Sequence, residues 1–382
     1  MKRYLEEAIK KDLGKKIILL SGPRQSGKTT LSKMLDPDFD YLDFDYAEHR
    51  LIINEKSWDR KKSLLILDEI HKKKNWKSFL KGIYDVEGLK PPIIVTGSAR
   101  LDTIRKTGDS LAGRYFHFRL HPLDIKELKN VIGPEETLEK LKRYGGFPEP
   151  FLESSDSFYR RWQRSHIDII LRQDLIDLEP VRSINQIETL IELLKTRVGS
   201  PVSYASLAGD LECSPKSVKN WLQILENLYV VFPVRPYHKN IARAILKEPK
   251  YYFYDSGLVK NSDGAQIENI TACALLKELH FLEDAYGFKT SINFLRNKQG
   301  KEIDFIIQVE EKKLLIEIKS SDDSLSSSFK IFEKYLPEAK KIQLVDEIKK
   351  EKTYPDKTEI RKLSTWLADL DLSPLNIQQF KL

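Results

Sequence analysis

The sequence predicts an α/β protein in which a parallel sheet with helices comes first and a smaller α/β region comes last. Over the first 130 residues, short apolar runs typical of buried strands alternate with segments compatible with helices. This alternation is the pattern of a parallel sheet covered by helices. The middle of the chain is mostly helical in pattern, and strand-like runs return after residue 250.

Composition places the chain among globular proteins with more than one core, since 41% of its 382 residues are hydrophobic and 32% are charged. The net charge of +7 permits nucleic-acid binding without requiring it, because 64 basic residues face 57 acidic ones. The two cysteines, Cys213 and Cys273, cannot form a disulfide framework. The polar start and the lack of a membrane-spanning apolar run predict a cytoplasmic protein without membrane contact.

The elements of the first third are short and clearly bounded. KKIILLSG reads as a strand with a turn, and KTTLSKML continues as a helix. Three further apolar runs are strand candidates, and a helical region opens after them. In chain order these segments are 15–22, 28–35, 40–45, 63–69, 91–98 and 121–131.

The turn after the first strand reads GPRQSGKT and matches the pattern G-x-x-x-x-G-K-[ST] between a strand and a helix. Its glycines let backbone N–H groups point at phosphate oxygens, Lys28 adds positive charge, and Thr29 offers a hydroxyl to Mg²⁺. The helix start adds a partial positive charge. We therefore predict that ATP and Mg²⁺ bind here. The predicted nucleotide contacts are Gly22, Pro23, Arg24, Gln25, Ser26, Gly27, Lys28, Thr29 and Thr30.

The run LLILDE predicts the second half of this site. Asp68 ends a buried strand, which is where ligands bind in open parallel sheets. It can complete the Mg²⁺ shell with Thr29, as a Walker-B aspartate does. Glu69 would orient or deprotonate the attacking water, so the pair favours ATP hydrolysis. A small-molecule kinase would not need the second acid and is a more distant alternative.

Two further groups complete the predicted ATPase site. Thr96 and Ser98 follow a third buried strand, where either hydroxyl could contact the γ-phosphate or the water. Arg114 follows a glycine and is a candidate arginine finger, acting in its own chain or from a neighbouring copy. The alternative is that Arg114 is an ordinary surface arginine. The sequence does not decide whether the protein forms a homo-oligomer or binds a protein partner.

Residues 200–237 fit a helix, a turn at 212–214, a second helix and a β-ribbon, which is the outline of a winged helix-turn-helix. The second helix would present Lys216, Lys219 and Asn220. A recognition helix with a basic wing predicts a DNA surface over 214–250. Contacts between domains or with a protein are the alternative. The basic residues of this segment are Lys216, Lys219, Arg235, Lys239, Arg243, Lys247 and Lys250.

Residues 301–320, KEIDFIIQVEEKKLLIEIKS, read as two apolar strands that carry charges. Side chains alternate between the faces of a strand, so pairing of the two runs can bring Asp304, Glu317 and Lys319 together. Two carboxylates can bind Mg²⁺ or Mn²⁺, and the lysine can position water. A half-exposed antiparallel hairpin with its charges in solvent is the alternative.

These segments together resemble a prokaryotic family of AAA-type P-loop ATPases whose C-terminal domain of unknown function looks like a PD-(D/E)XK nuclease. The resemblance implies ATP binding, slow hydrolysis and a second metal on Glu268, Asp304 and Glu317, with Glu268 as the additional helix acid. The most specific block is PKYYFYDSGL, followed by EIDF and EIK. The matching blocks cover 22–31, 65–72, 94–100, 111–123, 145–150, 249–258 and 301–320.

The predicted fold is thus a P-loop NTPase parallel sheet with helices, then a winged helix-turn-helix, then a small α/β PD-(D/E)XK-like domain. The predicted function is Mg²⁺-dependent ATP hydrolysis coupled to a nuclease-like effector that acts on DNA. The alternative is a non-cutting, nucleotide-dependent switch that binds DNA or a partner protein. The predicted segments are an AAA-type ATPase domain (1–130), a helical linker or lid (131–185), a winged-helix-like domain (186–250), a nuclease-like domain (251–350) and a charged tail (351–382).

Overall fold

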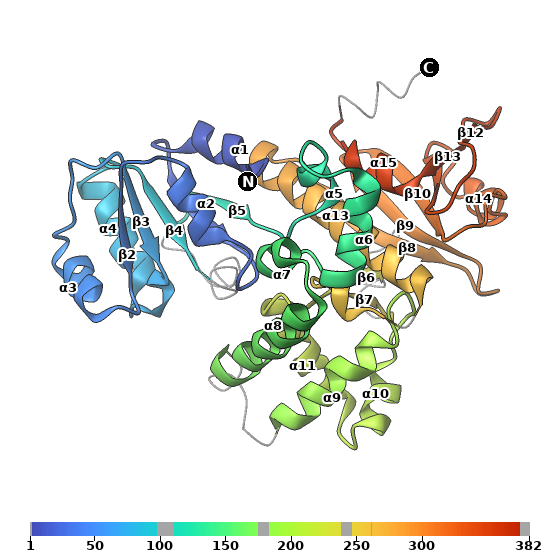
Figure 1. Ribbon diagram of the computed structural model, residues 1–382, viewed down its shortest axis with the longest axis horizontal. Helices are drawn as coiled ribbons and strands as arrows, with labels where there is room; N and C mark the ends of the chain where they lie inside the picture. The colour runs from blue at the N-terminus through green and yellow to red at the C-terminus, as the bar shows by residue number, and fades with distance from the viewer. Residues whose placement is uncertain (1, 98–110, 175–182, 238–246, 261, 375–382) are drawn as a thin grey trace. The chain divides into compact units, whose positions relative to one another are not determined.

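The computed structural model divides the protein into two compact units, each with its own hydrophobic core (Figure 1). Unit 1 contains residues 1–122 and the short segments 227–229 and 284–286, and unit 2 contains the rest. None of the helices in the described part of the chain has the length and apolar character of a membrane span. The structure describes residues 2–97, 111–174, 183–237, 247–260 and 262–374.

Unit 1 is built on a parallel sheet of five strands in the order β2-β3-β4-β1-β5. Each neighbouring pair is parallel, so all carboxyl ends lie at one edge of the sheet. This confirms the parallel sheet with helices that is typical of P-loop NTPases. The strands are β1 (Ile17–Ser21), β2 (Phe39–Asp43), β3 (Leu64–Asp68), β4 (Ile93–Thr96) and β5 (Tyr115–Arg119).

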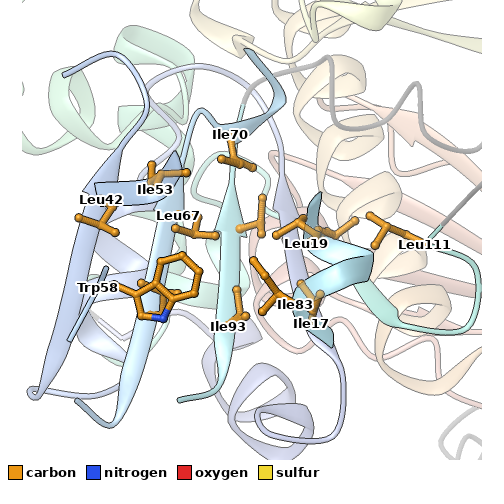
Figure 2. Packing of buried hydrophobic residues seen from close by; sticks show 13 residues of the cluster. Ile17, Leu19, Leu42, Ile53, Trp58, Leu67, Ile70, Ile83, Ile93 and Leu111 are labelled. Atoms are coloured by element: carbon orange, nitrogen blue, oxygen red, sulfur yellow. The ribbon is translucent and has the colours of Figure 1, made fainter. Parts of the chain in front are cut away.

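The central strands of unit 1 are apolar up to their last residue because both faces of the sheet are covered. In β1, Ile17 and Leu19 join one core cluster, while Ile18 and Leu20 on the other face are equally buried. A continuous apolar run is the pattern of a strand with two buried faces. Figure 2 shows the cluster between the sheet and its helices. The helical segments are α1 (Leu5–Asp12), α2 (Lys28–Met34), α3 (Ala47–Glu55), η1 (Ile70–Lys72) and α4 (Trp76–Val86).

The first half of unit 2 is helical. Proline in the first turn starts both α6 and α7, where the missing N–H has no partner to lose. Two short helices, α10 and α11, then follow with a turn between them, as the sequence predicts. The helical segments are α5 (Ile125–Leu128), α6 (Pro134–Tyr144), α7 (Pro148–Glu153), α8 (Asp156–Ile169), η3 (Ile170–Asp174), α9 (Ile184–Lys195), α10 (Tyr204–Asp210) and α11 (Pro215–Asn227).

The second half of unit 2 is an eight-stranded mixed sheet in the order β12-β13-β11-β10-β9-β8-β6-β7. The predicted β-ribbon, β6 and β7, belongs to this sheet because β6 pairs with β8. The predicted domain boundary at residue 250 coincides with the start of β7, so it separates two strands that pair with each other. The strands are β6 (Val231–Pro236), β7 (Lys250–Phe253), β8 (Thr290–Arg296), β9 (Glu302–Val309), β10 (Lys312–Lys319), β11 (Lys340–Val345), β12 (Lys352–Thr353) and β13 (Glu359–Lys362).

The helices of this half include one long helix, α13, which precedes the predicted strand pair. β9 and β10 form the predicted antiparallel pair, with Ile316 opposite Phe305. β10 also pairs in parallel with β11, so the strand pair is internal to the sheet and is not an isolated hairpin. The helical segments are η5 (Ser256–Leu258), α13 (Asp263–Tyr286), α14 (Ser328–Glu333) and α15 (Leu363–Ala368).

Candidate nucleotide site and acid cluster

The loop between β1 and α2 has the backbone that its glycines predict. Gly22 has φ of +146° and Gly27 has φ of +94°. A Cβ atom on Gly22 would lie 2.2 Å from the carbonyl oxygen of Leu120, so only glycine fits there. Lys28 is largely buried, and its Nζ donates to the carbonyl oxygens of Gly22 at 3.0 Å and Pro23 at 2.6 Å. The loop backbone therefore wraps around the ammonium group of Lys28.

Asp68 is the centre of a hydrogen-bond network at the carboxyl edge of the sheet. Its Oδ2 accepts from Thr29 Oγ1 at 2.7 Å and from the Tyr41 hydroxyl at 3.1 Å. Its Oδ1 accepts from Thr96 Oγ1 at 2.5 Å. The parallel register places Asp68 beside Thr96, which is why these distant segments meet. The structure thus brings together three residues that the sequence selected separately.

Tyr41 is a member of this network that the sequence analysis missed. Burial and the neighbouring Asp68 carboxylate raise the pKa of Tyr41 above its usual range, so it remains a hydroxyl donor. The available signal was its place in β2, two residues before the end of a strand that pairs with the Asp68 strand. Nothing in the tyrosine itself distinguished it from a core residue.

Glu69 follows Asp68 in the left-handed conformation, with φ of +53°. Its Oε2 lies 3.4 Å from Lys72 Nζ and 3.6 Å from His71 Nε2. Burial raises the pKa of Glu69, while Lys72 acts in the opposite direction. A carboxylate with a raised pKa is a stronger proton acceptor, which suits a group that activates water.

The structure does not bring Arg114 to the P-loop of its own chain. Arg114 precedes β5, and the register pairs Tyr115 with Ile17 at the amino end of β1, whereas the P-loop follows the carboxyl end. The guanidinium instead forms a two-point contact with Asp85, at 2.6 and 2.9 Å. The other predicted phosphate contact, Ser98, lies outside the described residues.

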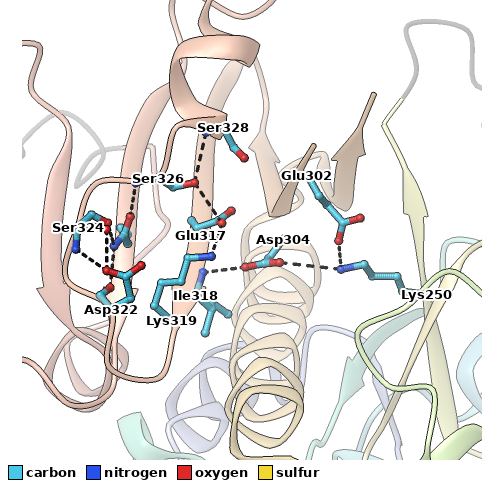
Figure 3. A network of polar contacts seen from close by, with 11 residues as sticks. Lys250, Glu302, Asp304, Glu317, Ile318, Lys319, Asp322, Ser324, Ser326 and Ser328 are labelled. Carbon is cyan, nitrogen blue, oxygen red and sulfur yellow. Dashed lines mark hydrogen bonds and ion pairs between the residues drawn. The ribbon is translucent and has the colours of Figure 1, made fainter. Parts of the chain in front are cut away.

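In unit 2, the predicted charged residues of β9 and β10 lie close together, as Figure 3 shows. The backbone N–H of Ile318 donates to Asp304 Oδ2 at 2.8 Å, and Lys319 Nζ donates to Glu317 Oε1 at 2.8 Å. Burial and the nearby Asp304 carboxylate raise the pKa of Glu317. These charged side chains are therefore partly buried, with Glu317 more buried than Lys319.

A lysine that the sequence analysis assigned to the DNA surface lies inside this acid cluster. Lys250 Nζ is 3.1 Å from Glu268 Oε1 and 4.0 Å from Asp304 Oδ1, and it also contacts Glu302. Its side chain is 1% exposed. Within the described ranges, no three His, Cys, Asp or Glu side chains are arranged to hold a metal.

The prediction of a second Mg²⁺ or Mn²⁺ on Glu268, Asp304 and Glu317 is therefore not supported by the described geometry and stays a prediction. The structure brings these carboxylates near one another, but the ammonium group of Lys250 is the cation that pairs with Glu268 and Asp304. Local sequence does not indicate this contact, because the lysine belongs to a different segment from the acids.

The basic segment 214–250 presents a smaller surface than its composition predicts. Lys216 and Lys219 are exposed on α11, and Lys247 is also exposed. Lys250 is buried among acids and contributes nothing to an outer surface. Lys239 and Arg243 lie outside the described residues. Among the described residues of the segment, Lys216 and Lys219 share the first turns of α11 with the exposed Asn220.

Comparison with protein families divides the chain into three matches. Residues 14–129 match an AAA domain model. Residues 135–267 and 263–366 match two domains of unknown function, DUF8612 and DUF4143. The sheet, the P-loop and the family match agree that residues 14–129 form an AAA-type P-loop ATPase domain, for which ATP is the expected ligand. The last match assigns no activity to the C-terminal domain.

Similar proteins extend over most of the chain. An uncharacterized protein of Mycobacterium tuberculosis is 25% identical over 329 residues, which cover 82% of this chain and 73% of its own. An uncharacterized protein of Methanocaldococcus jannaschii is 25% identical over 366 residues, covering 85% and 80%. Among solved structures, RuvB of Thermotoga maritima is 17% identical with a TM-score of 0.30, covering 60% of this chain and 86% of its own.

Proposed function

We propose that the protein is a Mg²⁺-dependent ATPase whose hydrolysis site lies between the P-loop and the end of β3. The observation that carries the proposal is the Asp68 network, in which Thr29 and Asp68 place a hydroxyl and a carboxylate oxygen 2.7 Å apart. Oxygen ligands of this kind suit Mg²⁺, which would supply positive charge to the β- and γ-phosphates.

Each residue of this site then has a distinct task. Lys28 holds phosphate oxygens with its ammonium group, and the loop N–H groups surround them. Thr96 and Tyr41 keep the Asp68 carboxylate in one orientation by donating to it. Glu69, with its raised pKa, accepts a proton from the attacking water. An arginine finger from Arg114 would require a second copy of the chain.

The decisive experiment measures ATP binding and turnover separately. We expect Lys28→Ala to abolish both, and Glu69→Gln to retain binding while turnover falls at least about 100-fold, because only the proton acceptor is lost. Lys62→Ala is the matched control, since this lysine forms an exposed ion pair with Asp38. Unchanged turnover in Lys28→Ala would overturn the ATPase proposal.

We further propose that the nucleotide acts as a switch and that the C-terminal domain binds without cutting. The support is the position of Lys250, whose charge pairs with acids that a nuclease would need for metal. DNA bound along α11, or a partner protein, remains the proposed target. The alternative, a DNA-cutting effector, requires a divalent ion in the acid cluster.

A DNA assay separates these two candidates. Pure protein with Mg²⁺ or Mn²⁺ should leave DNA intact, with or without ATP. If DNA is the target, its affinity should fall with added salt, and Lys216→Glu with Lys219→Glu should weaken it, because phosphate contacts release counterions. A flat salt response would remove DNA as the target. Cleavage that disappears in Asp304→Ala would overturn the non-cutting role.

A further inference from the structure

The surroundings of Lys250 form a mostly buried cluster in which the acidic groups outnumber the lysine. Three carboxylates, from α13 and β9, surround one ammonium group that is almost fully buried. Burying a lone charge is costly, so such a lysine is stable only when its partners compensate. The pKa of Lys250 is raised despite its burial, because Glu268, Asp304 and Glu302 favour the charged form. The three ion pairs therefore stabilise the charged form of the lysine.

Neighbouring segments pack closely against Glu268. Tyr252 shares a strand face with Lys250, and its hydroxyl donates to Glu268 Oε1 at 2.5 Å. Gly199 lies against the same carboxylate, since a Cβ there would be 2.8 Å from Glu268 Oε2. Pro201, two residues on, bridges to the backbone of Lys250. The segment between α9 and α10 therefore packs against the cluster, next to β7.

We propose that the ammonium group of Lys250 is the permanent cation of this cluster and excludes divalent metal from Glu268, Glu302 and Asp304. Ion pairs of this lysine link β7 to β9 and α13, where a bound metal would otherwise make the connection. A metal ion could bind there only if the charge of this side chain were removed. The inference deepens the non-cutting role proposed above, and it does not depend on the ATPase activity.

The consequence is that removing the lysine charge creates a metal site. In Lys250→Met the acids lose their counter-ion, and a divalent cation with oxygen ligands is the natural replacement. Lys341→Met is the matched control, because Lys341 is a buried lysine of the same sheet that pairs with Glu333 and Asp356. It should be destabilising without creating a metal site, since its partners are half-exposed.

The test is a Mn²⁺ titration of the full chain without nucleotide, read by electron paramagnetic resonance. We expect Lys250→Met to bind one more equivalent than the wild-type chain, with the gain lost in Lys250→Met/Asp304→Asn. Mn²⁺ should also raise the melting temperature of Lys250→Met more than that of wild type or Lys341→Met. A folded Lys250→Met without extra Mn²⁺ would overturn the inference.

The wild-type chain provides a second test if Lys250→Met does not fold. Asp304→Asn should leave wild-type Mn²⁺ binding unchanged, because no ion occupies the cluster while Lys250 is present. Lys250→Arg, which keeps the charge, should behave like wild type. Mn²⁺ binding to wild type that Asp304→Asn abolishes would contradict the proposal. None of these experiments measures ATP turnover. A negative result for the Lys250 proposal is therefore distinguishable from a failure of the ATPase proposal.

Discussion

At the scale of single residues, position along a strand decides what a carboxylate does. Asp68 accepts hydrogen bonds from three hydroxyl groups and is held in one orientation. Glu69, the next residue, has a left-handed backbone and a partly buried side chain whose pKa is raised. Two adjacent acids therefore have different chemistry, one suited to holding a cation and one to accepting a proton.

Thr96 gives a direct test of the orientation of Asp68. Thr96→Val removes the hydroxyl donor to Asp68 Oδ1 but keeps the shape of the side chain, and the backbone N–H of Glu69 remains as a donor to that oxygen. A hydrogen bond to a charged group contributes about 1.5–3 kcal/mol. We therefore expect half-maximal turnover to require roughly ten times more Mg²⁺. Thr189→Val, at an exposed position of α9, should leave the Mg²⁺ dependence unchanged. An unchanged dependence in Thr96→Val would exclude the orienting role.

Asp255 makes the stability of unit 2 depend on pH. It accepts from the Tyr159 hydroxyl at 3.0 Å and from Gly257 N at 3.1 Å, and burial raises its pKa from 3.8 to about 6. The folded state then holds a proton that the unfolded chain releases. The associated stability is complete below pH 3.8 and is lost as pH rises through about 6.

Asp255→Asn should remove this pH dependence, since the amide stays neutral at every pH. Urea unfolding of unit 2 would be measured between pH 4 and 8. The unfolding free energy of wild type should fall, relative to the variant, as pH rises from about 4 to about 6. If the unfolding free energies of the two proteins changed in parallel with pH, the pKa of Asp255 would be the same in the folded and unfolded chains, which would contradict this prediction.

At the scale of elements, the β1–α2 connection depends on one backbone position. Gly22 has a positive φ and lies against the Leu120 carbonyl. Gly22→Ala should destabilise unit 1 by about 2 kcal/mol or more and abolish ATP binding, because the loop must move away. Gly82→Ala, inside α4 with open space around it, should instead stabilise unit 1 by up to about 1 kcal/mol. Calorimetry and nucleotide titration measure both effects.

At the scale of the whole molecule, two separate cores predict two unfolding events. ATP and Mg²⁺ contact only residues of unit 1 in the proposed site, so they should raise its melting temperature selectively. Ligand at 100 times its Kd stabilises the bound unit by about 2.7 kcal/mol. Calorimetry with MgATP should move one transition, and Lys28→Ala should remove that shift. A shift of both transitions by MgATP in wild type would indicate coupling between the units.

Local sequence was sufficient for the features that depend on neighbours in the chain. The apolar runs of β1, β3 and β4 predict buried strands because each strand is covered on both faces. The P-loop follows from two glycines and a lysine at set spacing. Alternation along 301–320 predicts the antiparallel pair β9–β10. β5 was missed, because Phe118 is its one fully buried residue and the segment contains no continuous apolar run.

The sequence by itself determined the P-loop, the parallel sheet of unit 1 and the likeness to an AAA domain. Only the tertiary structure decided which charges meet. Arg114 pairs with Asp85 at the far end of the sheet, and Lys250 pairs with acids from α13 and β9. The physical reason is that strand register and long-range packing place these groups. A lysine counted as surface charge thus becomes the counter-ion of a buried acid cluster.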